Sequence, residues 1–252
     1  MLEVRGVSVR FGGLRAVDQV SFRVRGGSIT GLIGPNGAGK TTLFNVIAGS
    51  LRPAAGRVVL DGHRLDGQRP HRILRRGVGR TFQIPRPFLE MTVLENVMLA
   101  GQDQLGERLW PNWLRPGAVR DQERATRDRA RELLEFVGLT SLAGEPARVL
   151  SGGQRKLLEL ARVLMAGPRL ILLDEPAAGV SPTLLATILA RITELNRRGV
   201  TFLIIEHNMD VVMRLCRPLL VMAGGTLLLE GDPETVRSDP RVIDAYLGGV
   251  TP

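Results

Sequence analysis

The chain has 252 residues, of which 44% are hydrophobic and 23% are charged, values that are ordinary for one large globular domain or two modest ones. No apolar run approaches the roughly 18–20 residues of a membrane-spanning helix, and the first ten residues alternate like a strand, so neither a spanning helix nor a signal peptide is predicted. The formal net charge of +9 would allow nucleic acid or an anionic membrane surface as a partner. The arginines are scattered along the chain instead of gathered in one block, which favours a general preference for arginine as the surface cation.

Short strands and one helix are predicted for the first sixty residues. Alternating apolar and polar side chains, separated by turns, indicate strands at residues 2–9, 20–24, 28–34 and 56–60. Between the last two of these strands, the apolar spacing of residues 41–50 predicts a helix that ends at Gly49.

Helical patterns dominate from about Phe88 to Gly167. Residues 121–139 combine apolar positions at helical spacing with dense opposite charges, which is typical of a solvated amphipathic helix. Residues 155–164 form a second amphipathic run. This part of the chain is therefore predicted to be a mainly helical insert.

Two continuous apolar runs follow, residues 169–176 and 200–207, of the kind that forms buried parallel strands. The helix-like stretch 182–199 lies between them, which predicts a βαβ crossover. The predicted fold class is α/β. Its parts are an α/β core at residues 1–85 and 168–230, a helical insert at 86–167, and a C-terminal tail at 231–252 with one short helix and turns.

The segment GPNGAGKTT follows the pattern G-x-x-x-x-G-K-[ST] between an apolar strand and a helix. Glycines let backbone N–H groups turn inward around phosphate oxygens, and the helix start adds positive potential. Lys40 is expected to reach the β- and γ-phosphates, and the Thr41 hydroxyl to ligate Mg²⁺. Lysine is rare in this arginine-rich chain, which agrees with a need for a compact charge at this position. The predicted ATP-binding residues of the loop are Gly34, Pro35, Asn36, Gly37, Ala38, Gly39, Lys40, Thr41 and Thr42.

Three polar side chains come at the ends of the predicted parallel strands, where ligands bind in open α/β sheets. Asp174 is expected to hold Mg²⁺ through water, and Glu175 to orient a water for attack on the γ-phosphate. His207 follows the second strand and is expected to join them as a catalytic residue. On its own, the DEP segment could simply be the acidic end of a strand that Pro176 terminates. The presence of the phosphate loop favours a catalytic role for these acids instead.

The segment LSGGQ, residues 150–154, carries no charge, metal ligand or nucleophile, and the helical run RKLLELARVL follows it at once. Backbone N–H groups at a helix start can bind an anion, and Ser151 also fits the role of helix cap. A second phosphate site far from the first needs its own explanation.

Together these motifs resemble the ATP-binding subunits of ABC transporters. In the order of that family, the chain has Walker A GPNGAGKT, a Gln-loop candidate at Gln83, signature LSGGQ, Walker B LILLDE and a switch histidine at His207. The resemblance covers essentially the whole chain. It implies an ATPase with a P-loop NTPase core of the ABC ATPase type, an N-terminal antiparallel β subdomain and a helical subdomain insert, using ATP and Mg²⁺.

The resemblance also explains the second phosphate site, because two such subunits pack head to tail with each ATP between one Walker A loop and the other subunit's signature. The residues implied to contact ATP across the dimer are Ser151, Gly152, Gly153, Gln154 and Ser181. At the position of Ser181 the family often has an aspartate that makes a hydrogen bond across the dimer. In this chain the serine either makes that hydrogen bond itself or the bond is lost.

Two further assignments come from the resemblance. Phe11 lies where the family has an aromatic ring that stacks on adenine, although a core residue at a strand end fits equally well. Gln83 is implied to touch Mg²⁺ and to relay the nucleotide state to membrane subunits. Arg86, Phe88 and Leu89 would lie near that contact, or simply pack the insert.

Within the family, the segments GVGRTFQIPRPFLEMTVLENVMLA, LWPNWLRPGAVRD, DEPAAGVSP, EHNMDVVM and VIDAYLGG resemble the ATPase of branched-chain amino acid importers. The implied partners are two transmembrane permease subunits, a second ATP-binding subunit (a paralogue or a second copy) and, indirectly, an external substrate-binding protein. The implied location is the cytoplasmic face of the inner (plasma) membrane. A reducing compartment agrees with the single cysteine, Cys216, which cannot form an internal disulfide.

Several alternatives stay open. The ATPases of urea or amide importers, and of other ABC transporters, share many of these sequence features. A soluble ABC ATPase acting on nucleic acid or the ribosome is a different class, but the segment between Gln83 and Ser151 is too short for a long coiled coil and the chain has one cassette. A small-molecule kinase would share the phosphate loop without needing LSGGQ. No nucleic-acid partner is therefore expected.

Overall fold

The computed structural model describes residues 1–81, 85–102 and 116–247 and divides into two compact units. The sheet unit comprises residues 1–80, 169–178 and 192–252, and the helical unit comprises residues 81–168 and 179–191. Each unit is therefore built from segments that lie far apart in the sequence.

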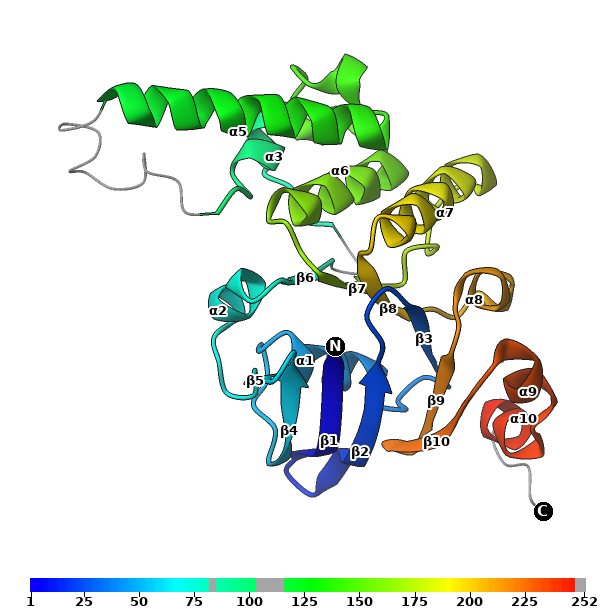
Figure 1. Cartoon of the computed structure of the whole chain (residues 1–252). Coiled ribbons are helices and arrows are strands. Elements are labelled where there is room, and N and C mark those ends of the chain that lie inside the picture. Colours follow the sequence, from blue (N-terminus) through cyan, green and yellow to red (C-terminus); the bar gives the residue numbers. More distant parts are fainter. Residues whose placement is uncertain (82–84, 103–115, 248–252) are drawn as a thin grey trace. The chain divides into compact units, whose positions relative to one another are not determined.

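An antiparallel sheet of four strands, in the order β2-β1-β4-β5, forms one part of the sheet unit (Figure 1). Its strands are β1 (Leu2–Phe11), β2 (Leu14–Val24), β4 (Ala55–Leu60) and β5 (His63–Arg64). Along β1 the buried positions change from even to odd numbers between Val4 and Val7, where the register shifts at Gly6. Gly6 has a φ of 58°, so a glycine bulge keeps both halves of the strand facing the core.

A sheet of six strands, in the order β10-β9-β3-β8-β7-β6, forms the other part, and all its pairs are parallel except β9 with β10. Its strands are β3 (Ile29–Ile33), β6 (Val78–Arg80), β7 (Leu170–Asp174), β8 (Thr201–Ile205), β9 (Leu219–Ala223) and β10 (Thr226–Gly231). All residues of β3, β7 and β8 are buried, as the apolar runs predict for parallel strands.

The helices of the sheet unit are α1 (Lys40–Ile47), α2 (Pro70–Arg75), α8 (Met209–Leu215), α9 (Pro233–Ser238) and α10 (Pro240–Leu247). Helix α1 contributes Leu43, Phe44, Val46 and Ile47 to one apolar core that also contains side chains of both sheets. Burying these four side chains contributes roughly 1.5–3 kcal/mol each and fixes the start of α1, and with it the phosphate loop, on the sheet.

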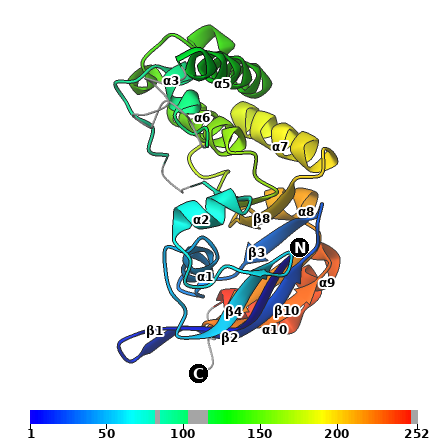
Figure 2. The same ribbon diagram turned by 60° about the vertical axis from the view of Figure 1, so that its left-hand side comes forward.

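The C-terminal segment contains two helices where the sequence analysis expects one. Asp232 and Asp239 each precede a proline that begins a helix, and Asp239 is in the extended conformation. A proline cannot donate the backbone hydrogen bond that a continuing helix requires, so Pro240 starts a new helix instead of extending α9. Both helices pack together beside β10 (Figure 2).

The helical unit contains α3 (Val93–Met98), α5 (Pro116–Val137) and α6 (Gly152–Met165), which pack against one another. Two 3₁₀ turns, Thr140–Leu142 and Ala147–Val149, connect α5 to α6. Helix α7 (Pro182–Arg197) contributes residues to both units. The predicted helices at 121–139, 155–164 and 182–199 are confirmed, as is the expected combination of an α/β core, an antiparallel β part and a helical part. Within the described residues, no helix combines the length and the apolar character needed to cross a bilayer.

Candidate nucleotide-binding site

The loop between β3 and α1 contains two glycines at which any side chain would collide with a neighbouring backbone. Gly34 has a φ of 146°, and a Cβ on it would lie 2.0 Å from the carbonyl oxygen of Met222 on β9. Gly39 has a φ of 96°, and its Cβ would lie 2.3 Å from the carbonyl oxygen of Ala16 on β2. The loop thus packs closely against two strands. Its last residue, Gly39, is the N-cap of α1 and has no side chain, so no side chain caps the N–H groups at the start of this helix.

Lys40 is the first residue of α1 and is only 5% exposed. Its Nζ donates hydrogen bonds to the carbonyl oxygens of Gly34 (2.6 Å) and Pro35 (2.8 Å). Burial lowers the pKa of this ammonium, while the carboxylates of Glu175 and Asp174 act in the opposite direction. The charge is therefore held over its own loop and within the field of both acids.

Asp174 ends β7, and its carboxylate is buried, with 5% exposure. Arg80, at the end of the neighbouring strand β6, donates to Asp174 Oδ2 at 3.4 Å and to Asn45 Oδ1 of α1 at 2.7 Å. Burial raises the pKa of Asp174, and Arg80 opposes this rise. Arg80 thus ties this acid to the helix that follows the phosphate loop.

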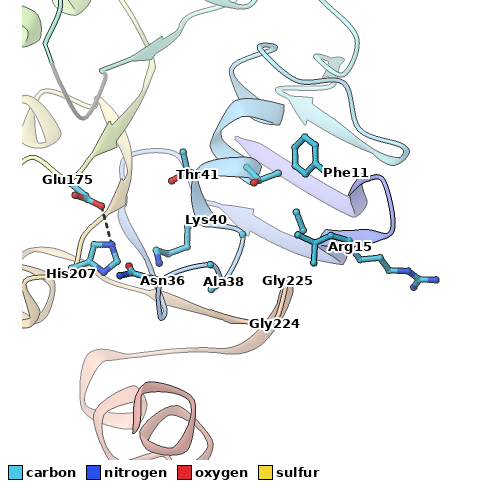
Figure 3. A pocket seen from close by; sticks show the side chains of 15 residues that line it. Phe11, Arg15, Asn36, Ala38, Lys40, Thr41, Glu175, His207, Gly224 and Gly225 are labelled. Atoms are coloured by element: carbon cyan, nitrogen blue, oxygen red, sulfur yellow. Dashed lines mark ion pairs between the residues drawn. The ribbon is translucent and has the colours of Figure 1, made fainter. Parts of the chain in front are cut away.

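Glu175 and His207 form a pair across the ends of β7 and β8, with His207 Nε2 lying 3.1 Å from Glu175 Oε1 (Figure 3). An ionised carboxylate only accepts hydrogen bonds, so this contact is a hydrogen bond when His207 Nε2 carries a proton. Glu175 has a φ of 50°, in the left-handed region that costs a non-glycine residue about 1–3 kcal/mol. Its N–H donates to the carbonyl of Ile205 at 2.9 Å, which holds this conformation in place.

A cleft of about 520 Å³ in the sheet unit brings these residues together, with Phe11 on one side of the loop and the Glu175–His207 pair on the other (Figure 3). From the predicted set it is lined by Phe11, Asn36, Gly37, Ala38, Gly39, Lys40, Thr41, Thr42, Glu175 and His207. Phe11 is 52% exposed, so the alternative of a core residue is wrong. The volume is typical of a small-molecule site.

One wall of this cleft was not predicted from the sequence; it is formed by Leu14, Arg15, Ala16, Gly224 and Gly225. The two glycines form the turn between β9 and β10, a hairpin that was also not predicted. Asp18 N–H donates to Gly225 O at 2.8 Å, which ties this turn to β2. A glycine pair between two apolar runs was the available signal.

The oxygen atoms at the site suit Mg²⁺. Thr41 is exposed and lines the cleft, whereas Asp174 does not line it and is a buried carboxylate in contact with Arg80. Among the described residues, no group of three or more His, Cys, Asp and Glu side chains could form a metal cage. Mg²⁺ commonly takes one or two protein oxygens and completes its octahedron with phosphate and water, so these two residues fit it.

The LSGGQ segment begins α6 in the helical unit. Ser151 caps the helix: its hydroxyl accepts from Gln154 N–H at 3.3 Å, and Gln154 Oε1 accepts from Ser151 N–H at 2.9 Å. The predicted cap is confirmed. A Cβ on Gly153 would lie 2.1 Å from a methyl group of Leu184, so this glycine allows α6 and α7 to approach closely. Gly152 is exposed beside it.

Ser181 belongs to the helical unit and is not among the residues that line the cleft. Ser181 is exposed, and its carbonyl accepts from Leu185 N–H at 2.8 Å in the first turn of α7. Gln83 lies outside the described residues. In the helical unit, the Arg162 guanidinium lies 5.6 Å from the centre of the half-exposed Phe88 ring and donates to Arg86 O at 3.0 Å.

Residues 17–178 match the ABC transporter family, and residues 226–250 match the family described as branched-chain amino acid ATP-binding cassette transporter. The high-affinity branched-chain amino acid transport ATP-binding protein BraF of Pseudomonas aeruginosa is 43% identical over 249 residues, which cover 98% of each chain. The corresponding protein LivG of Escherichia coli is 42% identical, again over 98% of each chain. A crystal structure of an ABC transporter cassette in its ADP conformation has a TM-score of 0.85 and 40% identity, covering 98% of both chains.

Proposed function

This chain belongs to the family of ABC transporter ATP-binding proteins, and from that premise we propose that it powers an importer of branched-chain or related amino acids. It is an ATPase of the ABC type that binds adenine nucleotides. The assignment of ATP hydrolysis is supported by the cleft in which Lys40 faces the Glu175–His207 pair. The similarity to BraF and LivG along 98% of the chain supports branched-chain amino acids as the transported compounds.

Nucleotide binding is assigned to the loop 34–42 and to Phe11. The N–H groups at the start of α1 and the Lys40 ammonium would hold the β- and γ-phosphates, because both present positive charge to the same side of the cleft. The exposed ring of Phe11 lies on the far side of the loop, where a base could stack on it.

Hydrolysis is assigned to Glu175 and His207. The carboxylate of Glu175 would accept a hydrogen bond from a water and direct its oxygen at the γ-phosphorus, while His207 Nε2 fixes the carboxylate at 3.1 Å. The water oxygen forms a bond to phosphorus as the bond to the β–γ bridging oxygen breaks, giving ADP and phosphate. Thr41 would hold Mg²⁺ directly and Asp174 would hold it through water; when bound, the metal neutralises phosphate charge, and Gln83 is assigned to the same metal.

A second ATP-binding subunit would complete the site. The uncharged start of α6, with Ser151, Gly152, Gly153 and Gln154, offers backbone N–H groups and a hydroxyl to the γ-phosphate held by a partner. Ser181 would make the remaining cross-dimer contact with a hydroxyl. The partner would be a paralogue or a second copy of this chain.

Transport needs proteins that form the pathway across the bilayer. We assign two transmembrane permease subunits as direct partners, an external substrate-binding protein as an indirect one, and the cytoplasmic face of the inner membrane as the location. An importer of urea or amides is the alternative within the same class.

Two experiments test this proposal. Glu175→Gln should bind MgATP and elute as an ATP-bound dimer in gel filtration. Its rate of ATP hydrolysis should fall by a factor of about 10²–10⁴, the range that one general base contributes. Lys40→Ala is the control that should hydrolyse nothing and stay monomeric. Native turnover in Glu175→Gln would contradict the catalytic assignment.

Gentle purification of the tagged chain from its native membranes, followed by mass spectrometry, tests the partners. Two multi-span permeases and a second ATPase should copurify. Ribosomal or chromosomal proteins that survive high salt would contradict the importer and support the soluble class of ABC ATPase.

A further inference from the structure

Glu206, between the end of β8 and His207, is a buried carboxylate with 3% exposure. Its Oε1 accepts a hydrogen bond from the N–H of Ala177 at 2.7 Å. Its Oε2 accepts from the N–H groups of His207 at 2.8 Å and Asn208 at 3.0 Å. One side chain thus receives three backbone N–H groups, all within the sheet unit.

These three N–H groups belong to two different loops. Ala177 lies two residues after Glu175, in the loop that follows β7, and the other two lie in the loop that follows β8. A buried carboxylate is costly unless hydrogen bonds compensate it, and bonds to an ionised acceptor are about twice as strong as neutral ones. The carboxylate therefore clamps the β7 loop and the β8 loop together.

Both ends of the clamp are next to the Glu175–His207 pair in the chain, since Ala177 is two residues after Glu175 and His207 is itself a member of the pair. Glu175 is held in a left-handed conformation, and the ring of His207 must stay 3.1 Å from its carboxylate. Neither requirement is local, because each depends on the distance between the two loops. The Glu175 N–H bond to Ile205 O joins the two strand ends, and the clamp extends this connection into the loops, at Ala177 on one side and at His207 on the other.

We propose that Glu206 is a positioning residue for hydrolysis, which sets the Glu175–His207 geometry by joining the loops after β7 and β8. This inference rests on the proposed function, since it assumes that Glu175 and His207 act on the attacking water. Glu206 itself touches no substrate: it acts through the two loops.

Glutamine cannot replace the clamp, although it has the same shape. An amide has one acceptor oxygen, and its NH₂ group only donates. If the oxygen receives the His207 and Asn208 N–H groups, the NH₂ group meets the N–H of Ala177 and repels it. The β7 loop is then released while the β8 loop stays bound, or the reverse. Glu206→Gln therefore removes one side of the clamp without creating a cavity.

The test measures steady-state ATP hydrolysis and nucleotide affinity of purified Glu206→Gln, His207→Ala and the double variant. We expect kcat of Glu206→Gln to fall about tenfold or more, while KM and the Kd for an ATP analogue stay within about twofold, because the phosphate loop is untouched. Since Glu206 acts through the pair, Glu206→Gln should lower kcat far less when His207 is already alanine.

Two controls separate positioning from general stability. Cys216, the only cysteine of the chain, is fully buried and is close enough to feel the charge of Glu206, so its reactivity toward a thiol reagent reports local opening. It should stay unreactive in Glu206→Gln. Asp66 is a matched carboxylate away from the cleft that accepts from Val58 N–H at 3.0 Å and from Arg64. Asp66→Asn should keep the native kcat.

Three results would overturn the proposal: native kcat in Glu206→Gln, a loss of kcat that appears together with reactive Cys216, or fully multiplicative losses in the double variant. A failure of the proposed function looks different. In that case the native chain does not hydrolyse ATP, or His207→Ala keeps the native kcat, before Glu206 is changed.

Discussion

The single residue that best illustrates a conflict between stability and binding is Lys40. Burial lowers its pKa, which means that folding disfavours the protonated form relative to the unfolded chain. Its hydrogen bonds to Gly34 and Pro35 satisfy two of the three ammonium protons. Keeping a buried charge at this cost agrees with the proposed role of Lys40 in holding phosphate.

Lys40→Met tests this conflict. Removing the buried charge should leave the melting temperature of the free protein equal or higher, whereas the rise caused by ATP should disappear. That rise corresponds to about 2.7 kcal/mol at a hundredfold excess over Kd. Thermal unfolding with and without ATP measures both. Lys156→Met, at the other lysine of the chain, is the control that should keep the ATP-dependent rise. A full rise in Lys40→Met would remove Lys40 from the site.

At the scale of elements, the phosphate loop depends on where its glycines meet neighbouring strands. Gly34 and Gly37 both have positive φ, yet only Gly34 is in contact with another backbone, at Met222. Around Gly37 there is nothing within 4 Å of an added Cβ. The two positions therefore separate backbone strain from close packing.

Gly34→Ala should lower the free energy of unfolding by about 3 kcal/mol or more, because β9 must move away, and Gly37→Ala by only about 1–2 kcal/mol from the left-handed backbone. Urea unfolding of the two variants measures the difference. Equal losses would show that the contact with β9 relaxes without cost.

The cap of α6 has a counterpart in the same unit, since Thr92 and Glu95 form the same reciprocal pair at the start of α3. Ser151→Ala and Thr92→Ala should each cost about 1 kcal/mol of stability. Only Ser151→Ala should also weaken the ATP-dependent dimer formed by Glu175→Gln, because the proposed cross-dimer contact uses that hydroxyl. Gel filtration at a series of ATP concentrations measures the fraction of dimer in each variant. Equal dimerisation in both variants would contradict the role of Ser151.

The burial of Cys216 makes the stability of the whole molecule depend on pH with a sign that can be worked out. Burial, and secondarily the charge of Glu206, raises the pKa of the Cys216 thiol from 9.0 to about 12. Between these values the thiol ionises only in the unfolded chain, which therefore binds fewer protons than the folded one. The free energy of unfolding accordingly falls as the pH rises above 9.

Urea unfolding at pH 8 and pH 10, compared with Cys216→Ala, isolates this group from all others that titrate. The native chain should lose about 1 kcal/mol more than the variant over this interval. Parallel losses would mean that the thiol ionises in the folded protein as it does in the unfolded one.

Local signals were sufficient for much of the fold and for part of the site. Strand–GPNGAGKTT–helix predicts both the turn and the position of Lys40, because glycine positions and helix starts are properties of neighbouring residues. Apolar runs predict β7 and β8, and helical spacing predicts α5, α6 and α7. The alternation of residues 2–9 predicts most of β1, but it left open whether Phe11, at the end of this strand, faces the core or the cleft.

What only the tertiary structure decided depends on pairs of residues far apart in the sequence. The strand order places β7 beside β8, and this brings Glu175 to His207 and Ala177 to Glu206. Asp174 and Glu175 are adjacent in sequence, yet only Glu175 faces the cleft, while Asp174 turns to Arg80. No sequence pattern contains these contacts, because side-chain direction at a strand end depends on the neighbouring strands. The sequence by itself thus determined which chemical groups are present and on which elements, and the packing of β6, β7 and β8 decided which of them meet.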